Sequence, residues 1–221
     1  MPTSVITLRP ATPQDVEVLA ALLVQLYHVE APGVLRGPLE GQWGFFQHLL
    51  AYELASGSGG RYLAINAAGE IVGTLGLRQP GRTLAMVLPP GTLRMAFQSI
   101  GYADTLRLIL SGLRAACAPE VILSHGEFYL YSVVVDAPMR GRGIGAKMIS
   151  SIEAITRQLG GHSLILRVLS DNSSARRLYQ RMGYQVVPRR PELLERLAIA
   201  IPSEEMRKVL DAHPTDAPIR V

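Results

Sequence analysis

Cysteine is nearly absent from the sequence, and this limits the chemistry that the chain supports. The one cysteine, Cys117, has no partner for an intrachain disulfide and excludes a cysteine-based zinc cluster. The histidines show no metal-ligand spacing; they are His28, His48, His125, His162 and His213. The sequence therefore predicts a protein without a disulfide and without a bound metal.

An excess of charge of one sign is also missing. The chain has 22 Lys and Arg against 18 Asp and Glu, and a net charge of +4 is too small to indicate a nucleic-acid partner. No apolar run approaches the roughly 20 residues of a membrane span. The amino-terminal Met-Pro-Thr-Ser-Val lacks the charged and then apolar pattern of a secretory signal. We therefore expect a cytoplasmic protein with no membrane or nucleic-acid partner.

The sequence does contain enough apolar residues for one sizeable core. Of its 221 residues, 48% are hydrophobic, which suits a single globular domain. We expect that domain over residues 1–210, with a helical insertion at about 81–120. Residues 211–221 are polar, contain prolines and are predicted to form a flexible tail.

Hydrophobic spacing predicts alternating strands and helices. The predicted strands are 5–9, 61–65, 70–77, 128–135, 163–169, 184–187 and, as a last strand to close the sheet, 205–210. The predicted helices are 12–27, 40–54, two between 92 and 117 with a break at Gly101 or Asp104, 143–159, 174–182 and 192–198. The aromatic helix at 40–54 is interpreted either as part of the core or as a wall of a substrate pocket.

The most informative stretch is a glycine-rich loop between a strand and a helix. Asp136-Ala137-Pro138 ends the strand, because proline cannot donate to a β-ladder. Gly141, Gly143 and Gly145 then precede the helix and allow a ligand to approach the backbone closely. Unpaired N–H groups at the positive end of a helix bind anions. With two arginines beside them, these groups predict a polyphosphate site.

Three phosphate-binding motifs compete for this loop. A Walker loop requires Gly-Lys-Ser/Thr, but Lys147 is followed by Met148. A dinucleotide-binding fold places its glycines in the first strand–helix unit with different spacing. The third motif fits: Arg140-x-x-Gly143-x-Gly145 after a strand resembles the pyrophosphate loop of the GNAT superfamily of N-acetyltransferases.

A second signature extends this resemblance over roughly residues 3–30, 61–78 and 125–210. It reads Asn172-x-x-Ala175-x-x-Leu178-Tyr179-x-x-x-Gly183-Tyr184. The resemblance implies an α/β (α+β) fold with a GNAT-type mixed, mostly antiparallel central sheet. Helices flank this sheet, and its fourth and fifth strands splay apart. It also implies acetyl-CoA as the co-substrate.

The resemblance assigns the co-substrate to two stretches and two side chains. The backbone of Val133, Val134 and Val135 would bind the pantetheine arm. The pyrophosphate would lie on Arg140, Gly141, Arg142, Gly143, Ile144, Gly145 and Ala146. Asn172 would bond the arm, although it is equally suited to cap a helix. Tyr179 is similar to the tyrosine that the family places near the coenzyme sulfur; the alternative is that it packs between helix and sheet.

The implied reaction is direct attack of a primary amine on the thioester. Tyr179 is then the candidate general acid for the departing thiolate. The base is less clear: Tyr129 stands where some relatives have a glutamate, and Glu127 shares its strand face two residues earlier. Glu127 is our first choice, and an ordinary strand-end glutamate is the alternative.

The acceptor is expected to contact residues 30–55 and 81–120. Their apolar composition with arginines suggests an amine with an apolar body or a carboxylate, whether a small molecule or a peptide. A second copy of the chain is a further candidate partner. Two other functions remain open from the sequence: a CoA-binding sensor without turnover, and a nucleotide-binding domain.

Overall fold

The computed structural model describes residues 5–56, 60–81, 88–117, 121–188 and 201–210. Its strands are β1 (Thr7–Pro10), β2 (Arg61–Ile65), β3 (Ile71–Arg78), β4 (Glu127–Val135), β5 (Ser163–Leu169), β6 (Gln185–Val186) and β7 (Ser203–Val209). Its α-helices are α1 (Val16–Glu30), α2 (Leu39–Ala55), α3 (Thr92–Ser99), α4 (Gly101–Ala116), α5 (Ile144–Gln158) and α6 (Ser173–Arg181). Short 3-10 turns are η1 (Pro13–Asp15) and η2 (Ala137–Met139). The predicted helix at 192–198 and the predicted tail lie outside the described residues.

The strands form one mixed sheet in the order β1-β2-β3-β4-β5-β7-β6. Only β4 and β5 pair in parallel; every other neighbouring pair is antiparallel. This confirms the predicted mixed, mostly antiparallel fold. The predicted last strand is present as β7, which begins at Ser203 and lies between β5 and β6. All seven residues of β7 pair with the seven residues of β5. The two residues of β6 could form too few backbone hydrogen bonds to take that position beside β5.

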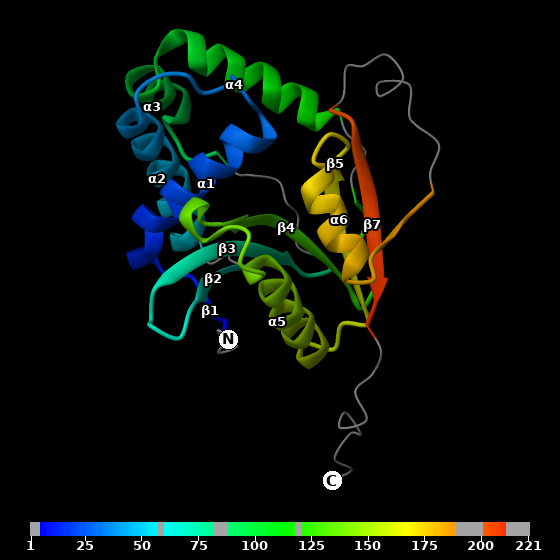
Figure 1. The fold of residues 1–221 in the computed structure, drawn as a ribbon. Coiled ribbons are helices and arrows are strands. Elements are labelled where there is room, and N and C mark those ends of the chain that lie inside the picture. The colour runs from blue at the N-terminus through cyan, green and yellow to red at the C-terminus, as the bar shows by residue number, and fades with distance from the viewer. Residues whose placement is uncertain (1–4, 57–59, 82–87, 118–120, 189–200, 211–221) are drawn as a thin grey trace.

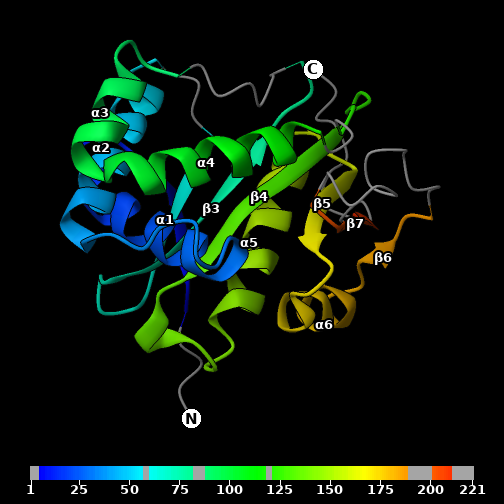
Figure 2. The same cartoon turned by 90° about the horizontal axis from the view of Figure 1, so that it is seen from above.

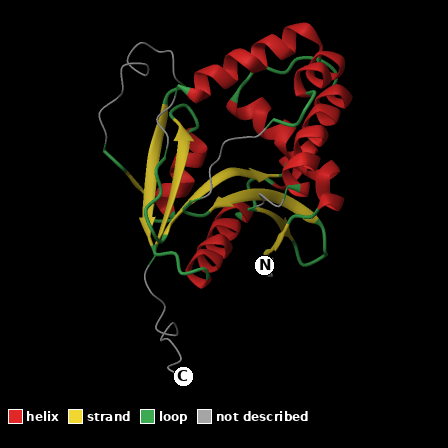
Figure 3. Cartoon of the chain, turned by 180° about the vertical axis from the view of Figure 1, so that it is seen from behind, coloured by secondary structure: helices red, strands yellow, loops and turns green. Residues whose placement is uncertain are grey.

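Helices cover both faces of the sheet (Figure 1). On one face α5 and α6 pack on a core that includes Leu130, Ile149, Leu166 and Met206. On the other, α1, α2 and α3 enclose a second core around Leu19 and the aromatic residues of α2. The two views in Figures 2 and 3 show α4 on the same side as α1–α3, with α5 on the opposite side. In the part of the chain that the structure describes, no helix is long and apolar enough to cross a bilayer.

The start of the first helix is held by a buried carboxylate. Asp15 accepts hydrogen bonds from both terminal nitrogens of Arg9, at 2.8 and 2.7 Å, and from the N–H and hydroxyl of Thr12, both at 2.8 Å. The Arg9 bonds, and then those from Thr12, hold the pKa of Asp15 well below its ordinary value despite burial. Its ionised form therefore stabilises the folded state.

We predict that Asp15→Ala lowers the free energy of unfolding by about 2 kcal/mol at neutral pH. Because the folded-state pKa is depressed, this contribution is present above the ordinary aspartate pKa of about 4 and is lost as the pH falls below it. Urea denaturation at pH 7 and pH 3 measures the effect. A difference between variant and wild type that is equal at both pH values would contradict the assignment.

Candidate active site

The site begins where β4 and β5 separate. Their parallel pairing covers Glu127–Leu130 against Ser163–Leu166 and ends there. On its other side, β4 continues along β3 to Val135, with an irregular register between Tyr131 and Val134. Within this irregular stretch Ser132 has a positive φ of 48°, a left-handed conformation that residues other than glycine rarely adopt. Past Leu130, the β5-facing edge of β4 is therefore available to a ligand, as Figure 1 suggests from the divergent strand directions.

A cavity of about 380 Å³ occupies this separation. It is lined by Gln25, Leu26, Val29 and Glu30 of α1, by residues 130–135 of β4, by Arg140, by Arg167 and Val168 of β5, and by Asn172, Ser174, Ala175 and Tyr179. Its walls alternate apolar side chains with a few polar groups, which is typical of a small-molecule site. The predicted Val133, Val134 and Val135 thus lie beside the predicted Asn172 and Tyr179.

The glycine loop lies between β4 and α5, beside Arg140 at the end of the cavity. Gly141 and Gly143 have φ values of 76° and 74°, and Gly143 is the residue that precedes α5. The first bond of the helix type runs from the N–H of Lys147 to the carbonyl of Gly143, at 3.3 Å. The N–H groups of Ile144, Gly145 and Ala146 precede that bond in the first turn, where a helix has no acceptor of its own. Arg142 is exposed next to them. The loop therefore presents donors and positive charge to an anion.

Gln25 of α1 holds this loop in place. Its amide nitrogen donates to Asp136 at 2.8 Å, and its carbonyl oxygen accepts from the N–H of Ala137 at 3.0 Å. The same oxygen accepts from Arg140 at 3.3 Å, while Arg140 also donates to the carbonyl of Val135 at 3.0 Å. These bonds tie the end of β4, the loop and α1 into one unit.

Asn172 and Tyr179 approach the cavity from α6. Asn172 caps the helix by accepting from the N–H of Ala175 at 3.1 Å, so its capping role holds while it also lines the cavity. Tyr179 is buried, with its ring against Tyr184 at a centroid distance of 5.8 Å. Burial, and then the nearby Glu30 and Tyr129, raise the pKa of Tyr179 above its ordinary range. Its phenol therefore keeps its proton at neutral pH.

Comparison with known proteins identifies the family. Residues 34–184 match the family model described as the acetyltransferase (GNAT) family, which is more than half of the chain. The chain belongs to the GNAT family. Two proteins of Bacillus subtilis (strain 168), each described as an uncharacterized N-acetyltransferase, share shorter stretches with it. YycN is 30% identical over 59 residues, 27% of this chain and 38% of YycN; YdgE is 34% identical over 58 residues, 26% of this chain and 37% of YdgE. The chain thus matches less than half the length of either relative.

Solved structures show the same GNAT fold over almost the whole chain. One described only as an acetyltransferase has a TM-score of 0.57 at 22% identity, over 93% of this chain and 100% of that chain. A Corynebacterium glutamicum protein described as histone acetyltransferase HPA2 and related acetyltransferase has a TM-score of 0.56 at 20% identity, over 95% and 98%. The yncA structure from Salmonella typhimurium, which is described with its cofactor acetyl-CoA, has a TM-score of 0.50 at 14% identity, over 97% and 99%.

The two base candidates suggested by the GNAT resemblance do not line this cavity, although Tyr129 lies near two residues that do, Glu30 and Tyr179. Glu127 is buried and accepts from Arg207 at 2.9 Å and from the N–H of Ser124 at 2.9 Å. Tyr129 stacks on Tyr131 at a centroid distance of 6.5 Å, with the Arg78 guanidinium 5.1 Å from its ring. Neither residue lines the cavity. Of the predicted residues, the cavity therefore brings together Val133, Val134, Val135, Arg140, Asn172 and Tyr179, whereas residues 141–146 of the loop, Glu127 and Tyr129 are not among those that line it.

Sequence reasoning missed several residues that do line the GNAT cavity. Gln25, Glu30, Tyr131 and Arg167 belong to no motif, and three separate elements bring them together. Among the aromatic residues of α2, Phe45 and Phe46 are buried in the second core, whereas Trp43 and Tyr52 are exposed, and none of the four lines the cavity. The one signal for Glu30 was its place at the start of residues 30–55, which were expected to contact the acceptor; the predicted helix ended near residue 27, whereas α1 continues to Glu30.

Proposed function

We propose that the chain is an N-acetyltransferase that transfers the acetyl group of acetyl-CoA to a primary amine by direct attack within a ternary complex. The observation that carries this proposal is the cavity between β4 and β5, which is lined both by Arg140 of the glycine loop and by Tyr179 of α6. Transfer from acetyl-CoA requires positive charge for the pyrophosphate and a reactive group around the same cavity.

The residues present fit this co-substrate. Beyond Leu130, the backbone edge of β4 offers donors and acceptors for the amides of the pantetheine arm. The glycine loop and α5 offer N–H groups, with Arg140 and Arg142 beside them, for the pyrophosphate. A fixed N–H of the bulged segment 132–135 is suited to polarise the thioester carbonyl. Tyr179, kept protonated by burial, is suited to give a proton to the departing sulfur.

We predict that the protein releases free thiol from acetyl-CoA only when a suitable amine is present. A thiol-reactive dye measures the release against a panel of small primary amines and amino-terminal peptides, with a tertiary amine as the control. Tight CoA binding without release by any of these amines would favour a sensor. Stronger thermal stabilisation by ATP or NAD than by acetyl-CoA would favour a nucleotide-binding domain. Either outcome contradicts the proposal.

A further inference from the structure

Glu30 is placed where a third group of the reaction would act. It is the last residue of α1, and it lines the cavity together with Tyr131 of β4 and Tyr179 of α6. Helix α1 lies against β4, and Figure 2 shows both elements next to the opening between β4 and β5. Glu30 therefore lines the same cavity as the residues assigned to the thioester.

The local structure gives Glu30 no stabilising role. A carboxylate at the end of a helix faces the negative end of the helix dipole, so it costs stability. Among the residues that the structure describes, none forms a hydrogen bond or an ion pair with the side chain of Glu30. Other acidic side chains near the sheet differ: Glu127 pairs with Arg207, and Glu153 pairs with Lys208. Residues whose local placement is unfavourable, and for which no other interaction offsets that cost, are found at functional sites.

The surroundings give this carboxyl a proton affinity suited to catalysis. Partial desolvation by the cavity raises the pKa of Glu30 to about 7, although the residue itself is exposed and water there moderates that shift. The titratable and charged groups that face it or line the same cavity are Tyr27, Tyr129, Tyr131, Arg140, Arg167 and Tyr179. A general base works best when its pKa lies near the working pH, and the exposure of Glu30 lets the proton escape to solvent.

We propose that Glu30 is the general base that takes a proton from the ammonium group of the acceptor. This inference rests on the acetyltransferase function proposed above. Two protons must leave the nitrogen as its bond to the acetyl carbon forms and the carbon–sulfur bond breaks. Glu30 takes the first from the ammonium and passes it to water. Tyr179 gives its own proton to the departing sulfur. The second proton from the nitrogen then reaches Tyr179 through water and restores its phenol.

The test is the pH profile of kcat for wild type and Glu30→Gln at saturating acetyl-CoA and amine. For wild type, we expect kcat to fall as the pH drops below an inflection near 7, where Glu30 becomes protonated. Glu30→Gln should lower kcat by about 100-fold at pH 7.5 and remove this inflection. The remaining kcat of Glu30→Gln should instead rise with pH in proportion to the fraction of the acceptor that is already a neutral amine. Glu30→Asp, which keeps the carboxylate, should restore part of kcat and the inflection.

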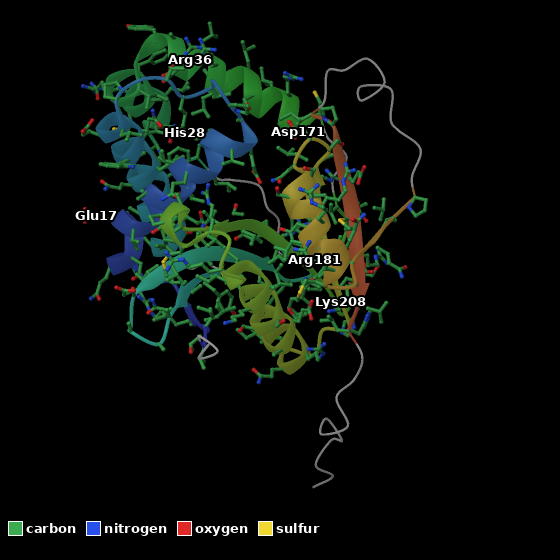
Figure 4. All side chains as sticks on the ribbon, viewed as in Figure 1. Glu17, His28, Arg36, Asp171, Arg181 and Lys208 are labelled. Atoms are coloured by element: carbon green, nitrogen blue, oxygen red, sulfur yellow. The ribbon has the colours of Figure 1, made fainter. Side chains whose placement is uncertain are left out.

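Glu17→Gln is the matched control, because it removes one negative charge from the first turn of the same helix. Figure 4 labels Glu17 on α1 away from the opening between β4 and β5. It should keep the wild-type profile, and all variants should bind acetyl-CoA within about twofold, which shows that they fold.

The outcomes separate this inference from the proposed function. A wild type that turns over no amine contradicts the acetyltransferase function itself. An active wild type whose Glu30→Gln variant keeps both rate and inflection overturns only the role of Glu30. If Glu127→Gln removes the inflection while Glu30→Gln does not, the base is Glu127.

Discussion

Tyr179→Phe should lower kcat by about 100-fold while leaving the affinity for acetyl-CoA within about twofold. The change removes one oxygen from a buried ring that keeps its packing against Tyr184. Without the phenol, the thiolate must leave unprotonated, whereas the contacts that we propose for the co-substrate come from β4 and the glycine loop. Steady-state kinetics measure kcat, and calorimetric titration with acetyl-CoA measures the dissociation constant.

The expected pH dependence of the wild-type kcat agrees with Tyr179 as the general acid. Burial raises the pKa of Tyr179 above its ordinary value, so no loss of rate from its ionisation is expected below about pH 10. Tyr102→Phe is the control, because that tyrosine is 80% exposed on α4. A Tyr179→Phe variant with the turnover of wild type would exclude Tyr179 as the acid, and an equal loss of affinity and turnover would make it a binding residue.

Lys208→Met should lower the free energy of unfolding by about 3 kcal/mol. Lys208 of β7 donates to both carboxylate oxygens of Glu153, at 2.8 and 2.7 Å, and Glu153 of α5 is only 4% exposed. Figure 4 labels Lys208 near the end of β7. Removing the ammonium leaves a buried carboxylate whose nearest other cation, Arg157, lies 4.0 Å away. Urea denaturation at pH 7 measures the loss.

The double variant Lys208→Met with Glu153→Leu separates the pair from the packing around it. Replacing both charges with apolar side chains of similar volume leaves no buried charge, so we expect the double variant to be more stable than Lys208→Met alone. A single variant within about 0.5 kcal/mol of wild type would show that Arg157 or water compensates Glu153. Equal losses in the single and double variants would assign the effect to packing.

Much of the fold and of the co-substrate site can be predicted from local sequence. The strand that ends at Asp136, the glycines before α5 and the capping Asn172 are short-range features. Their conformations depend on neighbouring residues: Gly143 adopts a left-handed conformation that other residues avoid, and Asn172 caps the helix that follows it. The order of these features along the chain sufficed for a resemblance to the GNAT family, which the family match then confirmed.

The rest depends on contacts between residues far apart in the chain. Nothing near Glu127 indicates that Arg207, eighty residues later, engages its carboxylate, because that pairing arises only once β7 lies beside β5. The bulge at Ser132 likewise depends on how β3 and β4 align. Glu30 reaches the cavity because α1 packs across β4, and its altered pKa reflects partial desolvation by distant segments. Local sequence thus determined the loop that we propose as the phosphate site, because hydrogen bonds and glycine conformation act over a few residues. Tertiary packing decided which side chains line the cavity where we propose that the amine attacks, because burial and charge pairing depend on the whole fold.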